Sequence, residues 1–303
     1  YNSMFLKQDT LNANPFWKYL LGSFIVIIFS IIGQLPLSFF ITAEAISEAG
    51  GDPMIALRNL DKNLQLFLIL IPFVFGFLGL YLVIKKLHNR NFVSITTSRS
   101  KVDWRRIIHS FILWGSITII FISADFFINS EDYQINFKFE KFFILLIIGF
   151  ILIPIQTSLE ELLFRGYLFQ GFSLYFKRPW IGLFLTSFIF GCLHIFNPEV
   201  QKLGLGILIY YIGTGLFLGI ITLMDEGIEL ALGFHAANNL ITALLVTSSW
   251  TAFQTESILI DISDPSLVGE TIISMLILYP LFYIYMYKKY KWSDLKNKLL
   301  VKI

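Results

Sequence analysis

The chain has 303 residues, of which 56% are hydrophobic, 17% aromatic and only 15% charged, and its formal net charge is +2. This composition excludes a soluble globular protein and indicates an integral membrane protein. The basic residues lie beside apolar stretches, so we expect no nucleic-acid partner. The single cysteine, Cys192, excludes an intrachain disulfide and a cysteine-based metal site.

Eight apolar stretches follow one another along the chain, each close to the roughly 20 residues that a helix needs to cross a bilayer. They cover residues 19–42, 64–84, 107–127, 142–176, 180–196, 204–224, 230–246 and 272–287. The first is too long for the apolar part of a signal peptide, so we expect it to be retained as a span, with a kink at Pro36. The sequence therefore predicts an all-α, polytopic membrane helix bundle of about eight transmembrane helices, with residues 1–303 forming a single integral membrane domain.

The connections between these stretches differ in charge. The loop between the second and third stretches and the C-terminal tail are rich in lysine and arginine, whereas residues 44–61 and 251–270 are mainly acidic. Because basic loops stay on the cytoplasmic side, we expect an integral protein of the bacterial inner membrane with both termini cytoplasmic and the lipid bilayer as a partner. One feature disagrees with this orientation, since Asp225, Glu226 and Glu229 place acids on the predicted inner side.

Two adjacent acids and an arginine stand inside an apolar stretch, in the segment 158–165, which reads SLEELLFR. In a helix, Glu161 and Arg165 are four residues apart and share a face, so we expect them to form a neutralising ion pair. Glu160 lies about 100° away around the helix and has no such partner. An unpaired carboxylate inside a membrane span is costly and marks a functional site.

The four histidines fall into two groups. His88 and His109 lie in or next to the basic loop, where we expect them to be solvated. His194 and His235 each lie in an apolar stretch. Either of these two alone is explained equally well as a hydrogen-bonded packing residue, and it is their occurrence together with Glu160 that indicates a site.

Helical geometry brings Glu160 and His194 to the same depth. If the stretches on either side of residues 176–179 form an antiparallel hairpin, Glu160 and His194 stand about 24 Å and about 21 Å from its turn, at a rise of 1.5 Å per residue. The two side chains are thus level to within about one helical turn. Phe190 shares the face of His194.

Asn239 shares the face of His235 in the next polar motif. If residues 204–224 cross the membrane fully, His194 is too far from His235 for the two to meet. A tilted or broken helix around residues 197–198 would bring them together, and the sequence leaves this open.

The chemistry of these side chains favours hydrolysis of an amide bond. A carboxylate and an imidazole that face a common water can remove its proton. The second histidine and the amide of Asn239 can donate hydrogen bonds to the developing oxyanion, and in a water-poor site such donors are usually the largest catalytic contribution. No serine or cysteine stands in a nucleophile context, so we expect no covalent intermediate and no cofactor.

A zinc site is the alternative. Glu160, His194 and His235 form a His₂Glu set that can bind Zn²⁺, with a water in the fourth position. No HExxH motif is present, which excludes a zincin-type site. The residues alone leave the choice between a metal-dependent and a metal-free site open.

Taken together, three motifs resemble the signatures of the CPBP family, the CAAX proteases and bacteriocin-processing enzymes also called the Abi family. The motifs are Glu160-Glu161-x-x-x-Arg165, Phe190-x-x-x-His194 and His235-x-x-x-Asn239. They occur in the order found in the family, and the resemblance covers a catalytic core of about residues 142–246. It implies an intramembrane endopeptidase that acts on a peptide or protein substrate at the membrane.

The resemblance also assigns roles to the motif residues. It makes four of them catalytic, namely Glu160, His194, His235 and Asn239. It makes three of them structural support, namely Glu161, Arg165 and Phe190. In this assignment Glu160 activates water with the aid of His194, while His235 and Asn239 form the oxyanion site.

Both a zinc mechanism and a metal-free glutamate mechanism are compatible with the resemblance. We favour the metal-free mechanism because the amide of Asn239 is a poor zinc ligand and a good hydrogen-bond donor. A non-proteolytic membrane scaffold or bacteriocin-immunity protein is an alternative function. A transporter that uses Glu160 and the histidines as a relay would require inverted repeats, and the sequence shows none.

Overall fold

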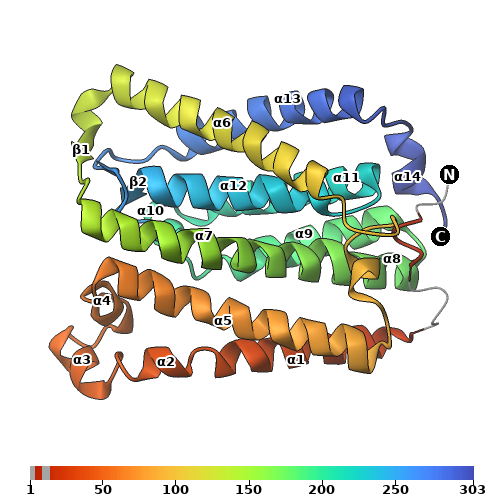
Figure 1. Cartoon of the computed structure of the whole chain (residues 1–303), viewed down its shortest axis with the longest axis horizontal. Coiled ribbons are helices and arrows are strands. Elements are labelled where there is room, and N and C mark those ends of the chain that lie inside the picture. The colour runs from red at the N-terminus through yellow and green to blue at the C-terminus, as the bar shows by residue number, and fades with distance from the viewer. Residues whose placement is uncertain (1–3, 9–13) are drawn as a thin grey trace.

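The computed structural model describes residues 4–8 and 14–303, and it consists mainly of helices that run along one long axis (Figure 1). The α-helices are α1 (Phe16–Ile32), α2 (Leu35–Ser38), α3 (Ala43–Glu48), α4 (Pro53–Arg58), α5 (Lys62–Leu82), α6 (Trp104–Ile128), α7 (Phe139–Glu161), α8 (Phe169–Phe176), α9 (Pro179–Leu193), α10 (Pro198–Leu203), α11 (Leu208–Asp225), α12 (Glu229–Leu245), α13 (Ser274–Lys289) and α14 (Leu295–Leu300). Wider π-helical turns cover Val83–Leu87, Leu162–Leu168 and Leu267–Ile273, and 3₁₀ turns cover Phe92–Ile95, Ser130–Asp132 and Leu205–Ile207. Three short strands are β1 (Tyr133–Ile135), β2 (Val246–Ser248) and β3 (Leu259–Asp261).

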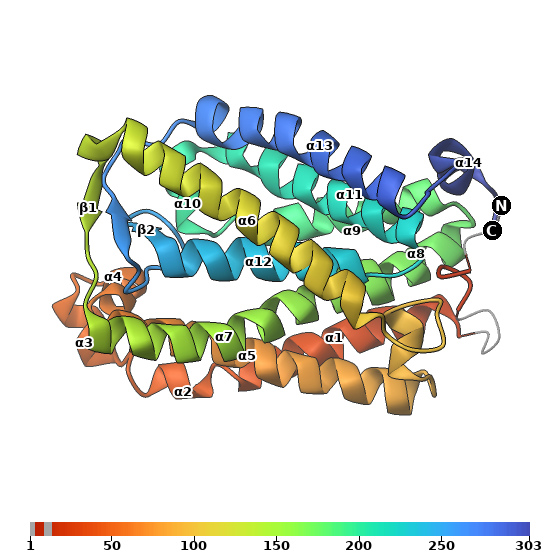
Figure 2. The same cartoon turned by 45° about the horizontal axis from the view of Figure 1, so that its top comes forward.

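Each of the eight predicted stretches is helical over most of its length. Within the described residues, six helical segments are long and apolar enough to cross a membrane: Phe16–Ser38, Lys62–Leu87, Trp104–Ile128, Phe139–Phe176, Leu205–Asp225 and Thr271–Lys289. The two others are shorter, since α9 has 15 residues and α12 has 17. Figure 2 shows α12 in the middle of the bundle among α6, α7 and α11, where neighbouring helices shield a short and partly polar helix from lipid. The all-α membrane bundle is confirmed, and the number of eight spans stays a prediction.

The first predicted stretch is not one kinked helix. α1 ends at Ile32, and residues 33–34 separate it from α2, in which Pro36 occupies the first turn. Proline fits the first turn of a helix because an N–H group there has no helical partner, whereas inside a helix it removes a hydrogen bond. The kink predicted at Pro36 is therefore wrong, and a break just before α2 takes its place.

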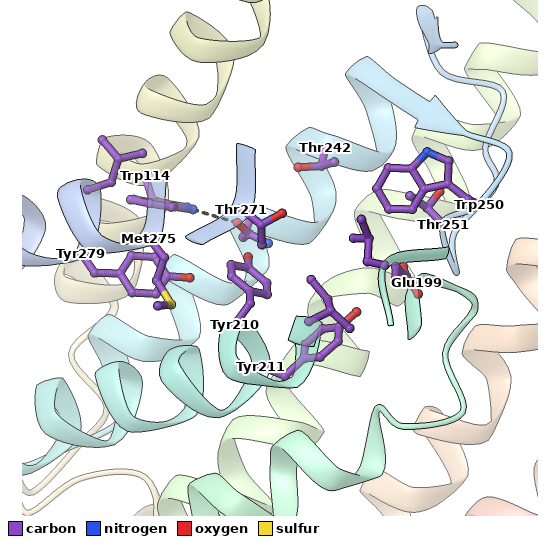
Figure 3. Close-up of a pocket in the computed structure, with 14 residues that line it drawn as sticks. Trp114, Glu199, Tyr210, Tyr211, Thr242, Trp250, Thr251, Thr271, Met275 and Tyr279 are labelled. Atoms are coloured by element: carbon purple, nitrogen blue, oxygen red, sulfur yellow. Dashed lines mark hydrogen bonds between the residues drawn. The ribbon is translucent and has the colours of Figure 1, made fainter. Parts of the chain in front are cut away.

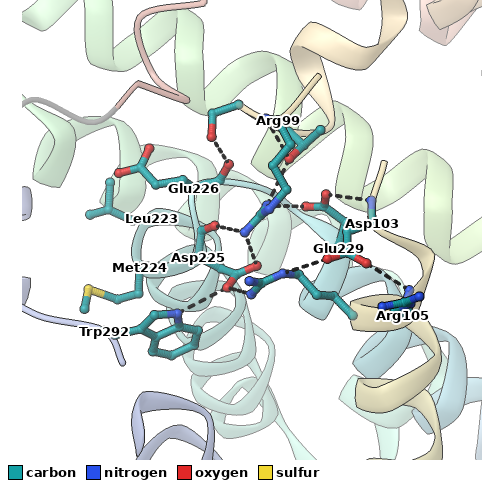
Figure 4. A network of polar contacts seen from close by, with 12 residues as sticks. Arg99, Asp103, Arg105, Leu223, Met224, Asp225, Glu226, Glu229 and Trp292 are labelled. Atoms are coloured by element: carbon teal, nitrogen blue, oxygen red, sulfur yellow. Dashed lines mark hydrogen bonds and ion pairs between the residues drawn. The ribbon is translucent and has the colours of Figure 1, made fainter. Parts of the chain in front are cut away.

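Two of the three acids that disagreed with the predicted orientation, Asp225 and Glu229, are paired with arginines of the basic loop (Figure 4). Asp225 contacts Arg106 and lies 3.3 Å from Arg99, and Glu229 lies 3.3 Å from Arg99 as well. Trp292 donates its indole N–H to the Asp225 carboxylate at 3.2 Å. The side chains of Asp225 and Glu229 are 1% and 0% exposed, so these pairs fasten the loop before α6 to the turn between α11 and α12. The acids are neutralised by arginines and so do not oppose a cytoplasmic position for this end of the bundle.

The two described ends of the chain lie at this same end of the bundle. The N–H of Phe5 donates to Glu226 at 2.9 Å, and Lys298 of α14 lies 2.7 Å from the other oxygen of that carboxylate. The N–H of Ile303 donates to the carbonyl of Lys177 at 3.2 Å. Both terminal segments therefore share one side with the basic loop, and which side of the membrane this is stays a prediction.

A small three-stranded sheet and the short helices α3, α4 and α10 lie at the opposite end of the bundle (Figure 1). The strand order is β1-β3-β2, with β1 antiparallel and β2 parallel to β3. Tyr133 of β1 is opposite Asp261 of β3, and Asp261 is also opposite Ser248 of β2. Because β2 directly follows α12, the sheet ties the end of the central helix to the loop after α6.

Two histidines are less exposed than their position in the sequence predicts. His88 is 1% exposed, and its Nε2 lies 2.8 Å from the hydroxyl of Tyr167. His109 is half-buried, and its ring contacts those of Tyr285 and Tyr290 at centroid distances of 5.7 and 6.3 Å. The prediction that both are solvated is wrong, because the basic segment packs against helix ends here.

The buried apolar side chains form three clusters, one around Phe190, one around Trp114 and one around Leu240. α12 runs between these clusters and approaches α6 closely at Gly233, where a Cβ atom would lie 2.1 Å from the carbonyl oxygen of Ile107. Only glycine permits this contact between a helix and a neighbouring backbone. One face of α12 is thus held against α6, and another packs against α7.

Candidate active site

Helix α7 carries polar side chains near its C-terminal end, among them Gln156, Glu160 and Glu161. Gln156 and Glu160 are four residues apart and share a face of the helix, and Gln156 Nε2 donates to Glu160 Oε1 at 2.6 Å. After Glu161 the helix widens into the π-helical turn Leu162–Leu168, a feature that is frequent at functional sites. Glu160 forms no ion pair within its own helix among the described residues, as predicted, but the spacing that pairs Glu161 with Arg165 also gives it a hydrogen bond from the neutral amide of Gln156.

The expected pair between Glu161 and Arg165 is present, with Arg165 Nη1 3.1 Å from Glu161 Oε1 and both side chains exposed by 2% or less. The guanidinium also lies 4.2 Å from the ring centre of Phe190 on α9, which is a cation–π contact. Phe190 in turn packs against the rings of His194 at 4.7 Å and His235 at 6.4 Å. The three residues predicted as structural support therefore form one buried unit that touches both histidines.

His235 on α12 stands between the two acids of α7. Its Nδ1 lies 2.7 Å from Glu161 Oε1, and its Nε2 lies 3.6 Å from Glu160 Oε2. Because an ionised carboxylate only accepts hydrogen bonds, the Nδ1–H of His235 is the donor of the hydrogen bond to Glu161. This contact fixes the orientation of the ring and turns Nε2 toward Glu160. A separation of 3.6 Å is too long for a direct hydrogen bond and too short for a water to lie between the two atoms, so a water that contacts both must lie beside them in the cavity.

Asn239 lies one turn further along α12 and is joined to α7 through Gln156. Its Nδ2 donates to Gln156 Oε1 at 3.2 Å, and its Oδ1 accepts from Asn238 Nδ2 at 3.2 Å. Trp114 of α6 donates to Asn238 Oδ1 at 3.1 Å, so a chain of hydrogen bonds runs from Glu160 across three helices. An amide has two N–H bonds, so Asn239 keeps one after its contact with Gln156.

His194 immediately follows α9, which ends at Leu193. Its Nδ1 lies 2.8 Å from the carbonyl oxygen of Phe190, and its ring stacks on Tyr211 of α11 at 4.2 Å. Nδ1 therefore donates to a carbonyl, and Nε2 is the nitrogen that stays free of this contact. In the described part of the chain His194 forms no direct hydrogen bond to Glu160, although both line the same cavity.

The helix break that the sequence left open is present after α9. The chain turns at residues 194–197 and forms the short helix α10. Helix α11 then begins at Leu208 and packs back along α9. α9 therefore stops at the level of the site. This break allows His194 to line the same cavity as His235.

A cavity of about 900 Å³ brings the predicted catalytic side chains together. Its walls come from α1 and α5 on one side and from α7, α9, α11 and α12 on the other, with β2 at one end. Glu160, His194, His235 and Asn239 all line it, and its size is typical of ligand-binding cavities. The structure thus gathers all four residues around one space, and the role of each stays a prediction.

The side chains as placed do not fit a catalytic zinc ion. Such a site takes three protein ligands, and over residues 4–8 and 14–303 no three His, Cys, Asp or Glu side chains are grouped as metal ligands. Glu160 and His235 approach one another, whereas His194 is turned toward Phe190 and Tyr211. Dependence on a metal stays a matter for experiment.

Sequence reasoning did not single out Gln156, Tyr211 or Glu199, which also line this cavity. Helical spacing indicates Gln156, because it lies four residues before Glu160. No spacing rule connects Tyr211 on α11 or Glu199 on α10 with α7, so only the fold reveals them. Burial raises the pKa of Glu199 above its usual 4.5, which marks it as a carboxylate in an apolar setting.

Comparison with known proteins identifies related chains. Residues 139–241 match the family described as type II CAAX prenyl endopeptidase Rce1-like. The chain is 31% identical over 241 residues to the uncharacterized protein YyaK of Bacillus subtilis strain 168, an alignment that covers 77% of this chain and 79% of that protein. No solved structure matches the chain significantly. The chain therefore belongs to the CPBP family of CAAX-type intramembrane proteases.

Proposed function

We propose that the chain is an intramembrane endopeptidase in which Glu160 activates the water that attacks a peptide bond. The observation that carries this proposal is the position of His235, whose Nδ1 lies 2.7 Å from Glu161 while its Nε2 lies 3.6 Å from Glu160. A water in the cavity beside these two groups would contact a carboxylate and an imidazole. General-base catalysis requires a base within reach of the water, and the Glu160 carboxylate is that base in the proposed arrangement.

The balance of charge supports the same arrangement. Glu160 and Glu161 bring two negative charges into a buried group, and Arg165 brings one positive charge. A second proton on His235 makes the group neutral, which reduces the cost of burying it. His235 then donates from Nδ1 to Glu161 and presents Nε2–H to the site.

In the proposed reaction, Glu160 takes a proton from water and the resulting hydroxide adds to the carbonyl carbon of the substrate. The charge that develops on the carbonyl oxygen is stabilised by Nε2–H of His235 and by the remaining amide N–H of Asn239. Glu160 then gives its proton to the amide nitrogen as the C–N bond breaks, and the products are a carboxylic acid, which then loses its proton to solvent, and an amine. His194 helps to orient the water from the opposite side of Phe190.

The proposed mechanism uses no metal. It is supported by Asn239, because an amide donates hydrogen bonds well and binds zinc poorly. It is also supported by the positions of Glu160, His194 and His235, which are not grouped as metal ligands in the described part of the chain. Treatment of the purified protein with 1,10-phenanthroline is expected to leave cleavage unchanged. Loss of activity that Zn²⁺ restores would instead favour a zinc site formed by Glu160, His194 and His235.

The proposed setting is the inner membrane of a bacterium, with residues 1–303 forming one integral membrane domain and about residues 142–246 its catalytic core. The substrate is a peptide or protein segment at the membrane. We place the end of the bundle that holds Arg99 and Asp225 in the cytoplasm, together with both termini. This is supported by the shared position of the two terminal segments and the basic loop.

The test uses protein reconstituted in liposomes and a peptide library made by digesting a bacterial membrane proteome, with new termini identified by mass spectrometry. Wild type is expected to generate new peptide termini, and Glu160→Gln and His194→Ala are expected to generate none. Both variants are expected to keep the thermal unfolding midpoint of wild type, which shows that they are folded. Full cleavage by either variant would refute the assigned roles. Biological function that survives Glu160→Gln would identify the chain as a non-proteolytic scaffold.

A further inference from the structure

A second cavity opens beside the active site, and we call it the aromatic chamber. It has a volume of about 400 Å³ and its walls include Trp114, Tyr210, Tyr211, Trp250 and Tyr279. Figure 3 shows Tyr210 and Tyr211 projecting from the first turn of α11 into the middle of the chamber, with Trp114 and Tyr279 toward one end and Trp250 toward the other. A space of this size and composition is typical of a binding site.

The aromatic chamber is continuous with the active-site cavity. Glu199, Tyr211, Asn238 and Trp250 are among the side chains that line both. Asn238 is hydrogen-bonded to Asn239, one of the proposed oxyanion donors. A substrate bound at Glu160 therefore has an adjoining space for one of its neighbouring side chains.

Among the described side chains that line the aromatic chamber, Glu199 is the one acid, and its charge is only partly compensated. One carboxylate oxygen accepts the backbone N–H of Ala252 at 2.8 Å, and the other is buried without a hydrogen-bond partner among the described residues. The basic side chains that act on it electrostatically are His194 and Arg58, and within the described residues neither forms an ion pair with it. Burial raises the pKa of Glu199, because the ionised carboxylate is removed from water and has few partners that would stabilise it.

The combination of these walls and this acid selects one class of group. The faces of tryptophan and tyrosine rings attract cations, and a carboxylate with a free oxygen completes such a site. Lysine and arginine have an apolar stem that suits the apolar wall and a charged end that suits the acid. An uncharged side chain would leave the carboxylate without a partner.

We propose that the aromatic chamber with Glu199 is a substrate subsite that binds the cationic side chain of a lysine or arginine close to the scissile peptide bond. This inference rests on the proposed peptidase function, because it names the kind of peptide that function acts on. Recognition combines contact with the aromatic rings and one charge-assisted hydrogen bond to Glu199.

Binding is measured on Glu160→Gln protein in phosphatidylcholine nanodiscs, so that neither cleavage nor lipid charge affects the result. The probes are fluorescently labelled alanine–leucine peptides of twelve residues with one lysine at each position in turn, and the same peptides with norleucine, which keeps the four-carbon stem of lysine and lacks its ammonium group. At one or two positions, lysine is expected to bind about tenfold more tightly than norleucine.

Two variants on the Glu160→Gln background decide the assignment. Adding Glu199→Gln is expected to abolish the preference for lysine while leaving the affinity for norleucine peptides unchanged, which also shows that the chamber is still folded. Adding Glu44→Gln, which neutralises an exposed acid on α3 at the same end of the bundle, is expected to leave the preference intact. Equal binding of the two peptide sets, or a preference that survives Glu199→Gln, would overturn the proposal.

The result is separable from the fate of the peptidase function. A preference for lysine that depends on Glu199, together with wild-type protein that cleaves no peptide, would keep the binding site and remove the catalytic proposal. Cleavage by wild type with no preference for lysine or arginine near the cleaved bond would do the reverse.

Discussion

In the buried group of Glu161, Arg165 and His235, we expect loss of the acid and loss of the arginine to destabilise the fold by different amounts. Arg165→Met leaves Glu161 with one hydrogen bond, from His235, and is expected to destabilise the fold by about 3 kcal/mol, as breaking a buried pair does. Glu161→Leu leaves the Arg165 charge without a partner, at about 3–5 kcal/mol, and also removes the acceptor of His235 Nδ1, at about 1–3 kcal/mol. The acid is therefore expected to matter more than the arginine.

At about 2 °C per kcal/mol for a chain of this size, Arg165→Met is expected to lower the thermal midpoint by about 6 °C and Glu161→Leu by at least about 8 °C. The double variant Glu161→Leu/Arg165→Met removes both charges and is expected to recover most of the loss, because two apolar side chains can replace a buried pair. Thermal unfolding in detergent, followed by tryptophan fluorescence, measures each midpoint. The double variant is still expected to be inactive, because His235 has lost the contact that orients it.

The matched control is Asp264→Ala, which breaks the ion pair between Lys202 and Asp264, a pair whose side chains are 43% and 90% exposed. Such surface pairs contribute little, so its midpoint is expected to equal that of wild type. Equal losses for Glu161→Leu and Arg165→Met, or a double variant less stable than either, would refute the account of this group.

Three further predictions concern other residues. Gln156→Leu removes the hydrogen bond that orients Glu160 and is expected to lower kcat/KM by about 100-fold with an unchanged thermal midpoint; unchanged cleavage would exclude a positioning role. Asp225→Ala leaves Arg106 without its buried partner and is expected to cost about 3 kcal/mol, seen as a lower midpoint; a neutral result would mean that the pairs in Figure 4 do not fasten the loop. Burial raises the pKa of Glu199, so its contribution to stability is full below pH 4.5 and is lost as pH rises through the folded-state pKa; wild type is therefore expected to lose stability relative to Glu199→Gln as pH rises above 4.5, and a constant difference would contradict this.

Much of the site follows from helical spacing within single stretches. The pair of Glu161 with Arg165 was predicted because side chains four residues apart meet on a helix. The same rule indicates the contact of Gln156 with Glu160, which sequence reasoning overlooked because it considered only charged partners. Spacing also brought Glu160 and His194 to a common depth, and both line one cavity.

Contacts between distant stretches do not follow from spacing. His235 bonds to Glu161 because α12 turns this face toward α7, which depends on the close approach of α12 to α6 at Gly233. Glu199 reaches the cavity only because α9 ends at Leu193 and the chain folds into α10. The buried position of His88 likewise depends on Tyr167 of a different segment, and a local reading of a basic loop predicts solvent instead.

The most direct test of the central claim is the appearance of new peptide termini in the membrane-proteome library, compared between reconstituted wild type and Glu160→Gln at matched amounts of folded protein. The substitution replaces one carboxylate oxygen by an amide nitrogen, so the cavity and the contact with Gln156 are retained in shape while the base is removed. Water activation by Glu160 predicts cleavage by wild type and none by the variant. Undiminished cleavage by Glu160→Gln would contradict it.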